Sequence, residues 1–552
     1  MNSQSPLPEG TGSAMQYDER VPRNIGTYPE KTLVDFVAEH ARVRPDAPAA
    51  LFKGRALTFG ELDRGSDALA RALADEGVTP GDRVALMLPN CPQFLLAELA
   101  IWKLGAIVAP LNLLYTDHEL AAALASSGPR LAIVLTPFYE RLKNIQTRTS
   151  IERIIVTNIK EYLPPLLRVL FTIAKEKKEG HRVDPRPGDL RFQSLLARSA
   201  SPLDSPWPKP SDPAVILMSG GTTGTPKGVL GHHRSLVMAG TQIATWLRDA
   251  LTGPGASVML PLPLFHAYGF AGAQCATFIE GIPLILIPNP RDIGDVAKSI
   301  QRDRPTLFCG VPTLFNALLN HPSVVSGKAD FRSIRACFSG AAALMAETKK
   351  RFETLTGGRI IEGYSLTEAM MACCCNPLNG ANKIGSVGMP LPDVEVRVVD
   401  GEIALRAPQL MLGYWQNAEE TGEMLRDGWL YTGDIGYIDD DGYLFLTDRK
   451  KDVIKTSGFQ VWPREVEEVI ATHPSVLEVG VAGLPDPEKS EIVAAWIVPR
   501  PGHVIDPQAI RRHCRESLAA YKVPARIETR SDLPKTMVGK ILRRALVAEN
   551  LH

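Results

Sequence analysis

Apolar runs alternate with helical patterns over much of this chain. Residues 82–88 predict a strand, and 93–103 predict a helix with one apolar stripe. Leu33, Phe36, Val37 and Ala41 share one face of an earlier helix. Further strands are predicted at 131–135, 154–156, 214–218, 284–287 and 306–308. This alternation indicates parallel sheets covered by helices, an α/β fold.

The pattern changes after about Gly385. Residues 394–399 and 401–406 read as short alternating strands with glycine breaks, which favours a small β-barrel or antiparallel layer. Past Asp448 a third region begins. It combines a helix opened by Pro463, a strand at 492–498 and a helix at 509–520. The helix after Pro463 has one apolar side, formed by Val466, Val469 and Ile470.

A chain of 552 residues is too long for one ordinary core. We expect residues 1–16 to be a disordered tail and 17–449 to form a large N-terminal domain. That domain would hold two parallel-rich α/β subdomains and a small β-barrel at about 385–448. Residues 450–552 suffice for a separate small α+β domain.

Composition narrows the function classes. The hydrophobic content of 45% is that of a soluble globular protein, and a formal net charge of +0 gives no reason to propose a nucleic-acid partner. Residues 1–17 are polar, which argues against export, and no apolar stretch has transmembrane length. A cytoplasmic location is therefore expected. The eight cysteines contain no Cys-x-x-Cys pair, and buried thiols are favoured over a metal site in the run Cys373-Cys374-Cys375.

Residues 162–178 leave two interpretations open. Leu166, Leu167, Leu170 and Ile173 form an apolar helical face, and three lysines follow, at positions 175, 177 and 178. The segment would lie on a membrane surface, or it would pack on the domain and leave a solvated basic end.

The segment from Ser219 to Gly228 holds four glycines and three threonines in ten residues. Glycine allows a loop to curl its amides around an anion, and Lys227 adds a charge. The apolar run before it predicts a phosphate-binding loop at the end of a strand. It is not the P-loop of common NTPases, because Pro226 and Gly228 flank the lysine. A mobile surface loop is the alternative.

Five further motifs follow this loop in order. They are Pro261–Tyr268, Glu362–Glu368, Tyr431–Asp434, Asp448–Lys455 with Ser457–Gln460, and Leu533–Lys540. The ordered set resembles the adenylate-forming superfamily of acyl-CoA synthetases, firefly luciferase and peptide-synthetase adenylation domains, over about residues 30 to 548. Within this superfamily the chain looks most like bacterial long-chain fatty-acid CoA ligases. Three segments carry this likeness: Asn289–Ile293, Thr313–Asn320 and the Glu-Gly-Tyr sequence that begins the motif Glu362–Glu368.

The resemblance implies a reaction in two halves, with ATP, Mg²⁺ and coenzyme A as cofactors. A carboxylate attacks the α-phosphorus of ATP, and the CoA thiol then attacks the acyl-AMP. Lys540 would supply the positive charge where the two anions meet; a solvated lysine is the alternative. Glu368 would be the magnesium carboxylate, against an ordinary Glu at a helix start. Thr223 and His266 complete the expected catalytic set, with His266 as a gate or orienting group rather than a general base.

Other roles come from the same resemblance. Lys451 would be the hinge of a mobile C-terminal domain, against a basic surface turn, and Lys455 and Gly458 would shape the CoA tunnel. The acyl pocket would hold His266, Tyr268, Phe270 and Gly340. The expected ATP or AMP contacts are Ser219, Gly220, Gly221, Thr222, Thr223, Gly224, Thr225, Lys227, Gly340, Ala341, Glu362, Gly363, Tyr364, Thr367, Asp434, Arg449 and Gln460. Of these, Asp434 and Arg449 would hold the ribose, although Thr-Gly-Asp is also an ordinary turn.

The resemblance therefore implies an ATP-dependent CoA ligase for a hydrophobic acid. A medium- or long-chain fatty acid is the first expectation for this substrate. The sequence leaves open a bulky specialised acid, a carrier-protein acceptor and the use of only one half-reaction. Luciferase-like oxygenation and a non-catalytic acyl or nucleotide binder are alternatives from other classes. An α/β-hydrolase is set aside, because no Gly-x-Ser-x-Gly surrounds a nucleophile. A homodimer and peripheral membrane contact also stay open.

Overall fold

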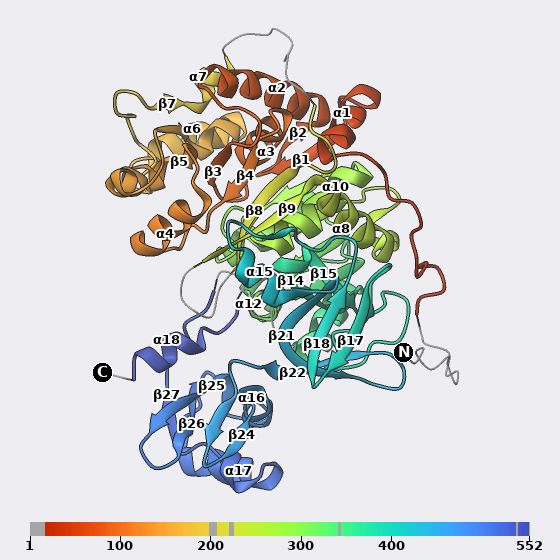
Figure 1. Cartoon of the computed structure of the whole chain (residues 1–552), viewed down its shortest axis with the longest axis vertical. Helices are drawn as coiled ribbons and strands as arrows, with labels where there is room; N and C mark the ends of the chain where they lie inside the picture. The colour runs from red at the N-terminus through yellow and green to blue at the C-terminus, as the bar shows by residue number, and fades with distance from the viewer. Residues whose placement is uncertain (1–16, 198–206, 220–225, 341–343, 537–538, 551–552) are drawn as a thin grey trace.

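The computed structural model describes residues 17–197, 207–219, 226–340, 344–536 and 539–550. The tail at 1–16, the loop residues Gly220 to Thr225, and Ala341 lie outside these ranges. Figure 1 shows the chain running from an upper α/β body through a second body and a small β unit to a lower C-terminal unit.

The upper α/β body is built on a sheet with eight strands in the described residues. Parallel pairing joins β8, β4, β3, β5, β6 and β7, and antiparallel pairing adds β9 and β19. In sheet order the strands are β19 (Gly413–Tyr414), β9 (Lys227–His232), β8 (Pro213–Ser219), β4 (Ile107–Pro110), β3 (Arg83–Met87), β5 (Leu131–Leu135), β6 (Arg153–Thr157) and β7 (Leu190–Arg191).

The second body has a sheet of nine strands in the described ranges. Six of them, β1 and β10 to β14, pair in parallel, so the prediction of parallel-rich α/β subdomains is confirmed. In order they are β16 (Met389–Pro390), β15 (Met371–Cys375), β14 (Arg359–Leu366), β13 (Ala336–Ser339), β12 (Leu307–Gly310), β10 (Val258–Leu260), β11 (Leu284–Leu286), β1 (Pro48–Phe52) and β2 (Arg55–Thr58).

Helices cover both sheets, and their starts follow local sequence. Thr32, Thr58 and Thr116 each form a capping box with the acid three residues later, which satisfies amides that the helix leaves unpaired. The helices are α1 (Leu33–Val43), α2 (Phe59–Asp75), α3 (Pro92–Lys103), α4 (Asp117–Ser127), α5 (Tyr139–Ile145), α6 (Pro165–Ala174), α7 (Phe192–Leu196), α8 (His233–Trp246), α9 (Arg248–Leu251), α10 (Cys275–Glu280), α11 (Ile293–Asp303), α12 (Pro312–Leu319), α13 (Pro322–Val325), α14 (Ala346–Thr356) and α15 (Ala418–Met424).

Helix α3 corrects one prediction. The sequence predicted a single apolar stripe, but every residue of α3 is buried. Trp102 donates its indole N–H to the Ala214 carbonyl at 2.8 Å, and the buried Lys103 ammonium pairs with Asp63 and Asp67. A helix that is enclosed on all sides has no polar face in contact with water. Its polar side chains therefore need hydrogen-bond or ion-pair partners within the protein.

The third unit is an antiparallel sheet of five strands within the described residues. Its glycine-interrupted strands lie where the alternating pattern predicted a β-rich unit. They are β17 (Glu395–Val399), β18 (Glu402–Arg406), β20 (Leu425–Arg426), β21 (Trp429–Ile438) and β22 (Leu444–Arg449). Strand β22 ends at the residue after which the chain enters the C-terminal unit.

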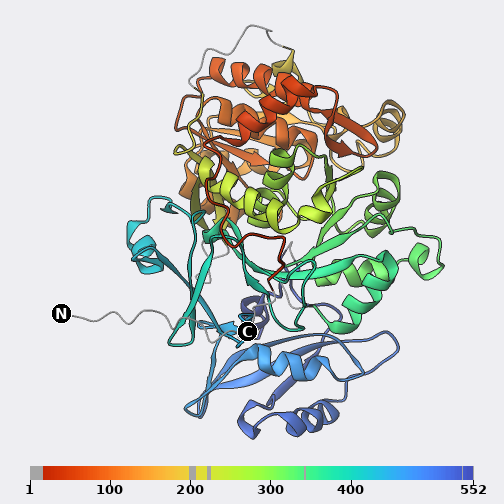
Figure 2. The same cartoon turned by 90° about the vertical axis from the view of Figure 1, so that its right-hand side faces the viewer.

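The C-terminal unit is α+β, as predicted, and Figure 2 shows it as a separate body beneath the rest. The predicted helix at 509–520 instead begins at Pro507 and ends at Ser517, because Leu518 is extended. Its elements are β23 (Ile454–Thr456), β24 (Phe459–Val461), α16 (Pro463–Ala471), β25 (Val476–Asp486), β26 (Ser490–Pro499), α17 (Pro507–Ser517), β27 (Arg526–Thr529) and α18 (Arg543–Ala548).

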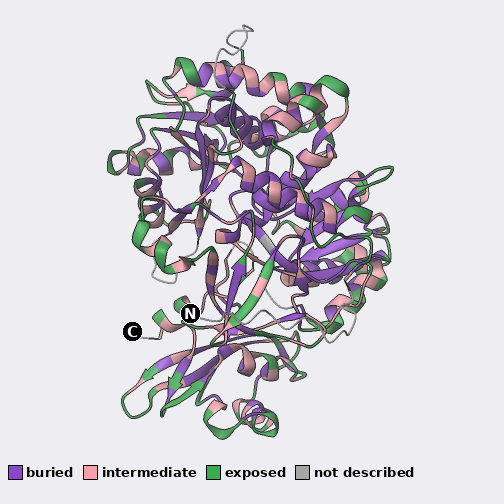
Figure 3. Ribbon diagram, turned by 45° about the vertical axis from the view of Figure 1, so that its right-hand side comes forward, coloured by how far each residue is buried: buried purple, intermediate pink, exposed green. Residues whose placement is uncertain are grey.

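Burial follows the layers: buried residues fill the strands and the inner helix faces in Figure 3. All eight cysteines are buried and free, and no group of metal-binding side chains occurs among the residues the structure covers. Burial raises the pKa of the Cys373, Cys374 and Cys375 thiols, so these are buried neutral thiols, as the sequence favoured.

Candidate functional site

The candidate site lies where parallel strands of the nine-stranded sheet end. Strands β10, β12, β13 and β14 are adjacent and parallel, so their carboxyl ends meet at one edge. The segments that follow carry His266, Thr313, Gly340 and Thr367. Motifs that are far apart in sequence are thereby brought to one place.

The glycine loop joins β8 to β9 as an antiparallel connection. Ser219 and Lys227 are paired Cα partners at its base, and Ser219 is buried. The Lys227 ammonium pairs with Glu420 and lies 5.6 Å from the centre of the Tyr414 ring. Desolvation, and then the charge of Lys451, lower the pKa of Lys227. The base of the loop therefore carries a cation close to the other charged residues of the site.

Glu368 lies in the 3-10 turn Thr367–Ala369, directly after β14. The Tyr414 hydroxyl donates a hydrogen bond of 2.9 Å to Glu368 Oε1. No lysine or arginine forms an ion pair with Glu368 in the described part of the chain. A carboxylate with an oxygen to spare fits Mg²⁺, which takes few protein ligands and keeps its waters.

Asp434 on β21 faces Arg449 on β22 as a cross-strand pair. Arg449 Nε lies 2.9 Å from Asp434 Oδ1, and the Tyr364 hydroxyl donates to Oδ2. Each carboxylate oxygen accepts more than one hydrogen bond, so both oxygens can still take a ribose hydroxyl. Burial, and then the charge of Asp434, raise the pKa of Tyr364, whose ring is buried.

Close packing explains two glycines near this edge. A Cβ on Gly363 would lie 2.5 Å from the Phe338 ring, and one on Gly340 would lie 3.1 Å from the Tyr268 ring. Glu362 accepts the Leu344 amide at 3.2 Å, and burial raises the pKa of its carboxyl group. Glu362 thus ties the segment after Gly340 to β14.

Lys540 reaches this edge from the C-terminal unit. Desolvation, and then Arg449, lower the pKa of Lys540 to about 8, while Asp434 opposes the shift. Burial, and then the charge of Lys540, lower the pKa of His266 to about 4. The Lys540 side chain is still exposed to solvent. Its desolvation comes from protein atoms that lie around it without covering it completely. The charge of Lys540 therefore couples to His266, Asp434 and Arg449.

A tight contact holds Lys540 there. Gly539 has φ +75°, and a Cβ on it would lie 2.9 Å from Thr313 Oγ1 at the start of α12. The Lys540 amide donates to Thr536 Oγ1 at 3.1 Å. The two domains therefore approach so closely at Gly539 that a side chain there would collide with α12.

Charged residues surround the expected hinge. Arg543 Nη1 lies 3.4 Å from Asp448 and 2.8 Å from Asp452, on either side of Lys451. Burial lowers the pKa of Arg543, but Glu467 and these aspartates outweigh it, so the net pKa is raised. Lys451 lies close enough to Lys227 to shift its pKa. The hinge role of Lys451 stays a prediction, as does the alternative of a basic turn.

The expected CoA residues lie on one exposed hairpin. Lys455 and Gln460 are cross-strand partners on β23 and β24, and Gly458, with φ +82°, forms the turn. Figure 1 places β24 in the C-terminal unit, away from α18. Gln460 was expected at the nucleotide, yet it shares a hairpin with the expected CoA residues. In the described residues no hydrogen bond links Gln460 to Asp434 or Glu368.

The expected acyl residues lie in an enclosed, mostly apolar region. Tyr268 and Phe270 belong to the π-helical segment Tyr268–Gln274, in which every residue is buried. The Tyr268 hydroxyl donates to the Phe338 carbonyl at 2.6 Å, and the Phe270 ring packs edge-on against Trp102 of α3. At the end of the segment Gln274 donates to the buried Glu98 carboxyl group.

Sequence reasoning missed several residues of this site. Tyr414, Glu420 and Thr313 contact the predicted residues from β19, α15 and α12. Thr313 belongs to the motif Thr313–Asn320, which indicated only the family, and the other two residues belong to none of the family motifs. No periodicity signal could have found them, because their importance comes from contacts across the fold.

No helix in the described residues is long and apolar enough to cross a membrane.

Comparison with known proteins supports a common architecture. The family described as AMP-binding enzyme matches residues 37–415, and its C-terminal domain matches residues 465–540. A long-chain-fatty-acid–CoA ligase of Bacillus subtilis is 37% identical, with 97% of each chain covered. One of Yersinia pestis is 36% identical, also covering 97% of each. An anthranilate CoA ligase crystallised with anthranoyl-AMP superimposes with a TM-score of 0.82 at 27% identity, covering 95% of this chain and 98% of that one.

Proposed function

The chain belongs to the AMP-binding enzyme family, and we propose that it joins a hydrophobic carboxylic acid, a medium- or long-chain fatty acid, to coenzyme A with ATP. It is an AMP-forming acid–CoA ligase by family and binds ATP. The finer proposal concerns its substrate and the roles of its residues.

The single observation that carries the proposal is the position of Lys540. The preceding residue, Gly539, lies against Thr313 of the N-terminal body, and the charge of Lys540 contributes to the lowered pKa of His266. Joining a carboxylate to a polyphosphate brings two anions together, and a cation at that point lowers the barrier. With a pKa of about 8 the lysine is still mostly protonated at neutral pH.

The first half-reaction forms an acyl-AMP. A carboxylate oxygen attacks the α-phosphorus, the bond to the β-phosphate oxygen breaks, and pyrophosphate leaves. Lys540 stabilises the charge that builds up between carboxylate and phosphate. Asp434 and Arg449 hold the ribose, and Ser219 and Lys227 support the phosphate-binding loop. Glu368 would hold Mg²⁺, which supplies charge neutralisation to the phosphates when bound.

The second half-reaction transfers the acyl group. The CoA sulfur attacks the carbonyl carbon, AMP leaves as the C–O bond breaks, and the thiol proton is released. Lys455 and Gly458 lie on the exposed hairpin of β23 and β24. In this proposal the C-terminal unit turns about Lys451 to bring that hairpin to the site. His266 is neutral at physiological pH, which suits an orienting group beside an anionic substrate.

Two observations support a fatty acid as the proposed substrate. The relatives from Bacillus subtilis and Yersinia pestis are named for long-chain fatty acids. The segment Tyr268–Gln274 is fully buried and mostly apolar, which suits an acid recognised by burial.

The decisive experiment is acid-dependent pyrophosphate–ATP exchange in the absence of CoA, with fatty, aryl and amino acids compared. Exchange with medium- or long-chain fatty acids supports the proposal, and exchange only with aryl or amino acids refutes the proposed substrate. Folded protein that exchanges with no acid is then given acyl-AMP and CoA. Thioester formation there would limit the enzyme to the second half-reaction.

A further inference from the structure

Helix α6 presents its apolar side chains to solvent. Leu166, Val169, Leu170 and Ile173 are 71%, 55%, 52% and 80% exposed. At the helical repeat these four side chains fall within one arc of about 100°. No residue of α6 is buried. The helix therefore contributes its apolar face to no core.

The opposite face of α6 is the one that meets the protein. Phe171 packs edge-on against His181 with ring centres 5.2 Å apart, and Thr172 lines a cavity behind the helix. A surface helix of a globular protein normally turns its apolar stripe inward and its polar residues outward. In α6 the leucines point outward instead, and the helix packs on the domain through Phe171.

Cations gather at the end of the apolar face. Glu176 pairs with Lys160 at 2.5 Å, and Glu179 pairs with Lys175 at 3.3 Å. In the described chain no carboxylate forms an ion pair with Lys177, Lys178 or Arg182. The whole chain has a formal net charge of +0, so this excess of positive charge is local.

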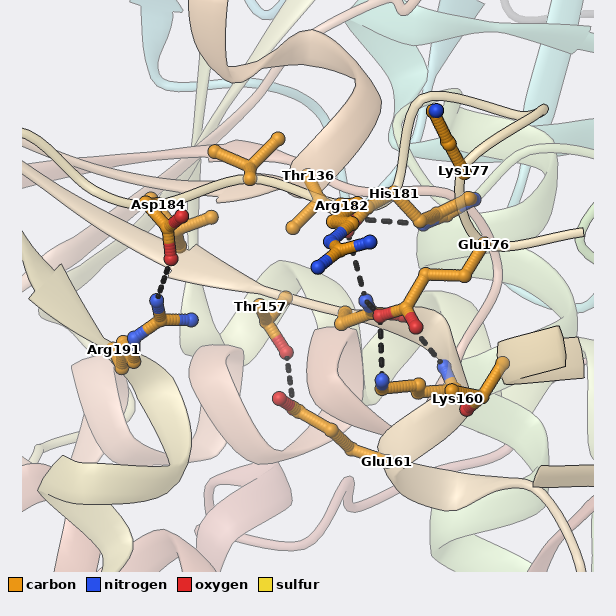
Figure 4. A pocket seen from close by; sticks show the side chains of 14 residues that line it. Thr136, Thr157, Lys160, Glu161, Glu176, Lys177, His181, Arg182, Asp184 and Arg191 are labelled. Atoms are coloured by element: carbon orange, nitrogen blue, oxygen red, sulfur yellow. Dashed lines mark hydrogen bonds and ion pairs between the residues drawn. The ribbon is translucent and has the colours of Figure 1, made fainter. Parts of the chain in front are cut away.

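The cavity behind α6 belongs to the same surface. Its volume is about 460 Å³, and its lining includes Lys177 and Arg182. Figure 4 shows the Arg182 guanidinium extending towards the middle of the cavity, with Lys177 at its edge. The paired groups Lys160–Glu176 and Asp184–Arg191 form its walls.

We propose that α6 docks this protein on an anionic lipid bilayer. The side chains of Leu166, Leu170 and Ile173 enter the boundary between headgroups and acyl chains, and Lys177, Lys178 and Arg182 contact lipid phosphates. An interfacial helix needs this combination of an apolar face and adjacent cations.

Charge favours a membrane over a second copy of the chain. Residues 163–174 contain no Asp or Glu. Residues 163–174 of a second copy would therefore offer no carboxylate to Lys177 and Lys178. A bilayer containing phosphatidylglycerol offers both an apolar layer and negative charge.

The test is co-sedimentation of the full chain with vesicles of phosphatidylcholine, with and without phosphatidylglycerol. We expect binding to the anionic vesicles that weakens with added salt. The triple variant Leu166→Gln, Leu170→Gln, Ile173→Gln should lower the partition coefficient by about ten-fold or more, because the apolar contact is lost. The double variant Lys177→Glu, Lys178→Glu should lower it also and reduce its salt dependence.

Two matched controls use exposed residues elsewhere. Val325 and Val504 are 73% and 88% exposed, and Val325→Gln with Val504→Gln should leave vesicle binding unchanged. Lys328→Glu is the charge control. Failure of the intact protein to bind anionic vesicles, or triple-variant binding equal to wild type, overturns the proposal. A dimer in solution that the triple variant abolishes, without vesicle binding by wild type, assigns the face to a second copy instead.

Discussion

Tyr414 on β19 of the eight-stranded sheet donates its hydroxyl at 2.9 Å to Glu368 Oε1, in the turn that follows β14 of the nine-stranded sheet. The same ring lies against the Lys227 ammonium. One side chain therefore positions both the proposed magnesium carboxylate and the cation at the base of the glycine loop. Burial, and then the charge of Glu368, raise the pKa of Tyr414, so its hydroxyl stays protonated and donating.

Tyr414→Phe should slow adenylation about ten-fold or more, because a hydrogen bond to a charged group contributes roughly 1.5–3 kcal/mol. The ring contact with Lys227 survives in this variant. Thioester formation from supplied acyl-AMP should change little. Pyrophosphate–ATP exchange and single-turnover thioesterification measure the two halves. An unchanged exchange rate would show that the hydroxyl does not position Glu368.

Lys540→Ala should abolish adenylation and largely spare thioesterification of supplied acyl-AMP, because the ammonium serves only where two anions meet. The loss should be about a hundred-fold or more, as for removal of one group that stabilises a transition state. Lys489→Ala, an exposed lysine of the same domain, is the control. Equal loss of both half-reactions would contradict the assigned role.

The pH profile of adenylation should report Lys540. Its pKa is lowered to about 8, and the protonated form is the useful one, so the adenylation rate should fall as pH rises through about 8. Lys540→Arg should be slower but lose this alkaline limb, since arginine stays charged. The limb should be absent from the thioesterification rate. A limb that persists in the arginine variant assigns it to another group.

Gly539→Ala should impair adenylation about ten-fold or more. The position has φ +75°, and the new methyl group would lie 2.9 Å from Thr313 Oγ1. Both effects act where the C-terminal unit meets α12, so thioesterification should be nearly unaffected. Thr313→Ala in the same chain should restore part of the loss by removing the collision but not the backbone strain. No recovery would show that α12 is not the obstacle.

Glu98→Gln should lose less folding stability than the wild type as pH rises. Burial raises the pKa of Glu98 well above its ordinary value of 4.5, so the folded protein keeps a proton that the unfolded chain releases. Stability is therefore lost as pH rises above that value, by up to about 1.4 kcal/mol per pH unit, until the folded pKa is reached. The glutamine has no such titration and can still accept from Gln274. Urea unfolding at about pH 5 and about pH 8 measures the difference, with exposed Glu516→Gln as the control.

Sequence by itself determined the elements and their chemistry. Periodicity predicted β3, β5, β6 and the helix after Pro463, because each depends on side chains that are neighbours along one strand or one helical face. The motif order predicted the family, and the residue types at Lys540, Glu368 and Asp434 predicted which chemistry each could perform. Buried thiols were favoured at Cys373 to Cys375 because adjacent cysteines on a strand point to opposite faces, which suits a single metal poorly.

Only the tertiary structure decided which residues meet. Tyr414 reaches Glu368, and Gly539 meets Thr313, across distances that no local pattern encodes. Helix α3 has no exposed face, although its sequence resembles a helix with one apolar stripe, because enclosure depends on layers from distant parts of the chain. For α6 the sequence left two interpretations open, since periodicity shows that a helix has two faces but not which face meets the protein. Packing decides that, and here it turns the leucines outward.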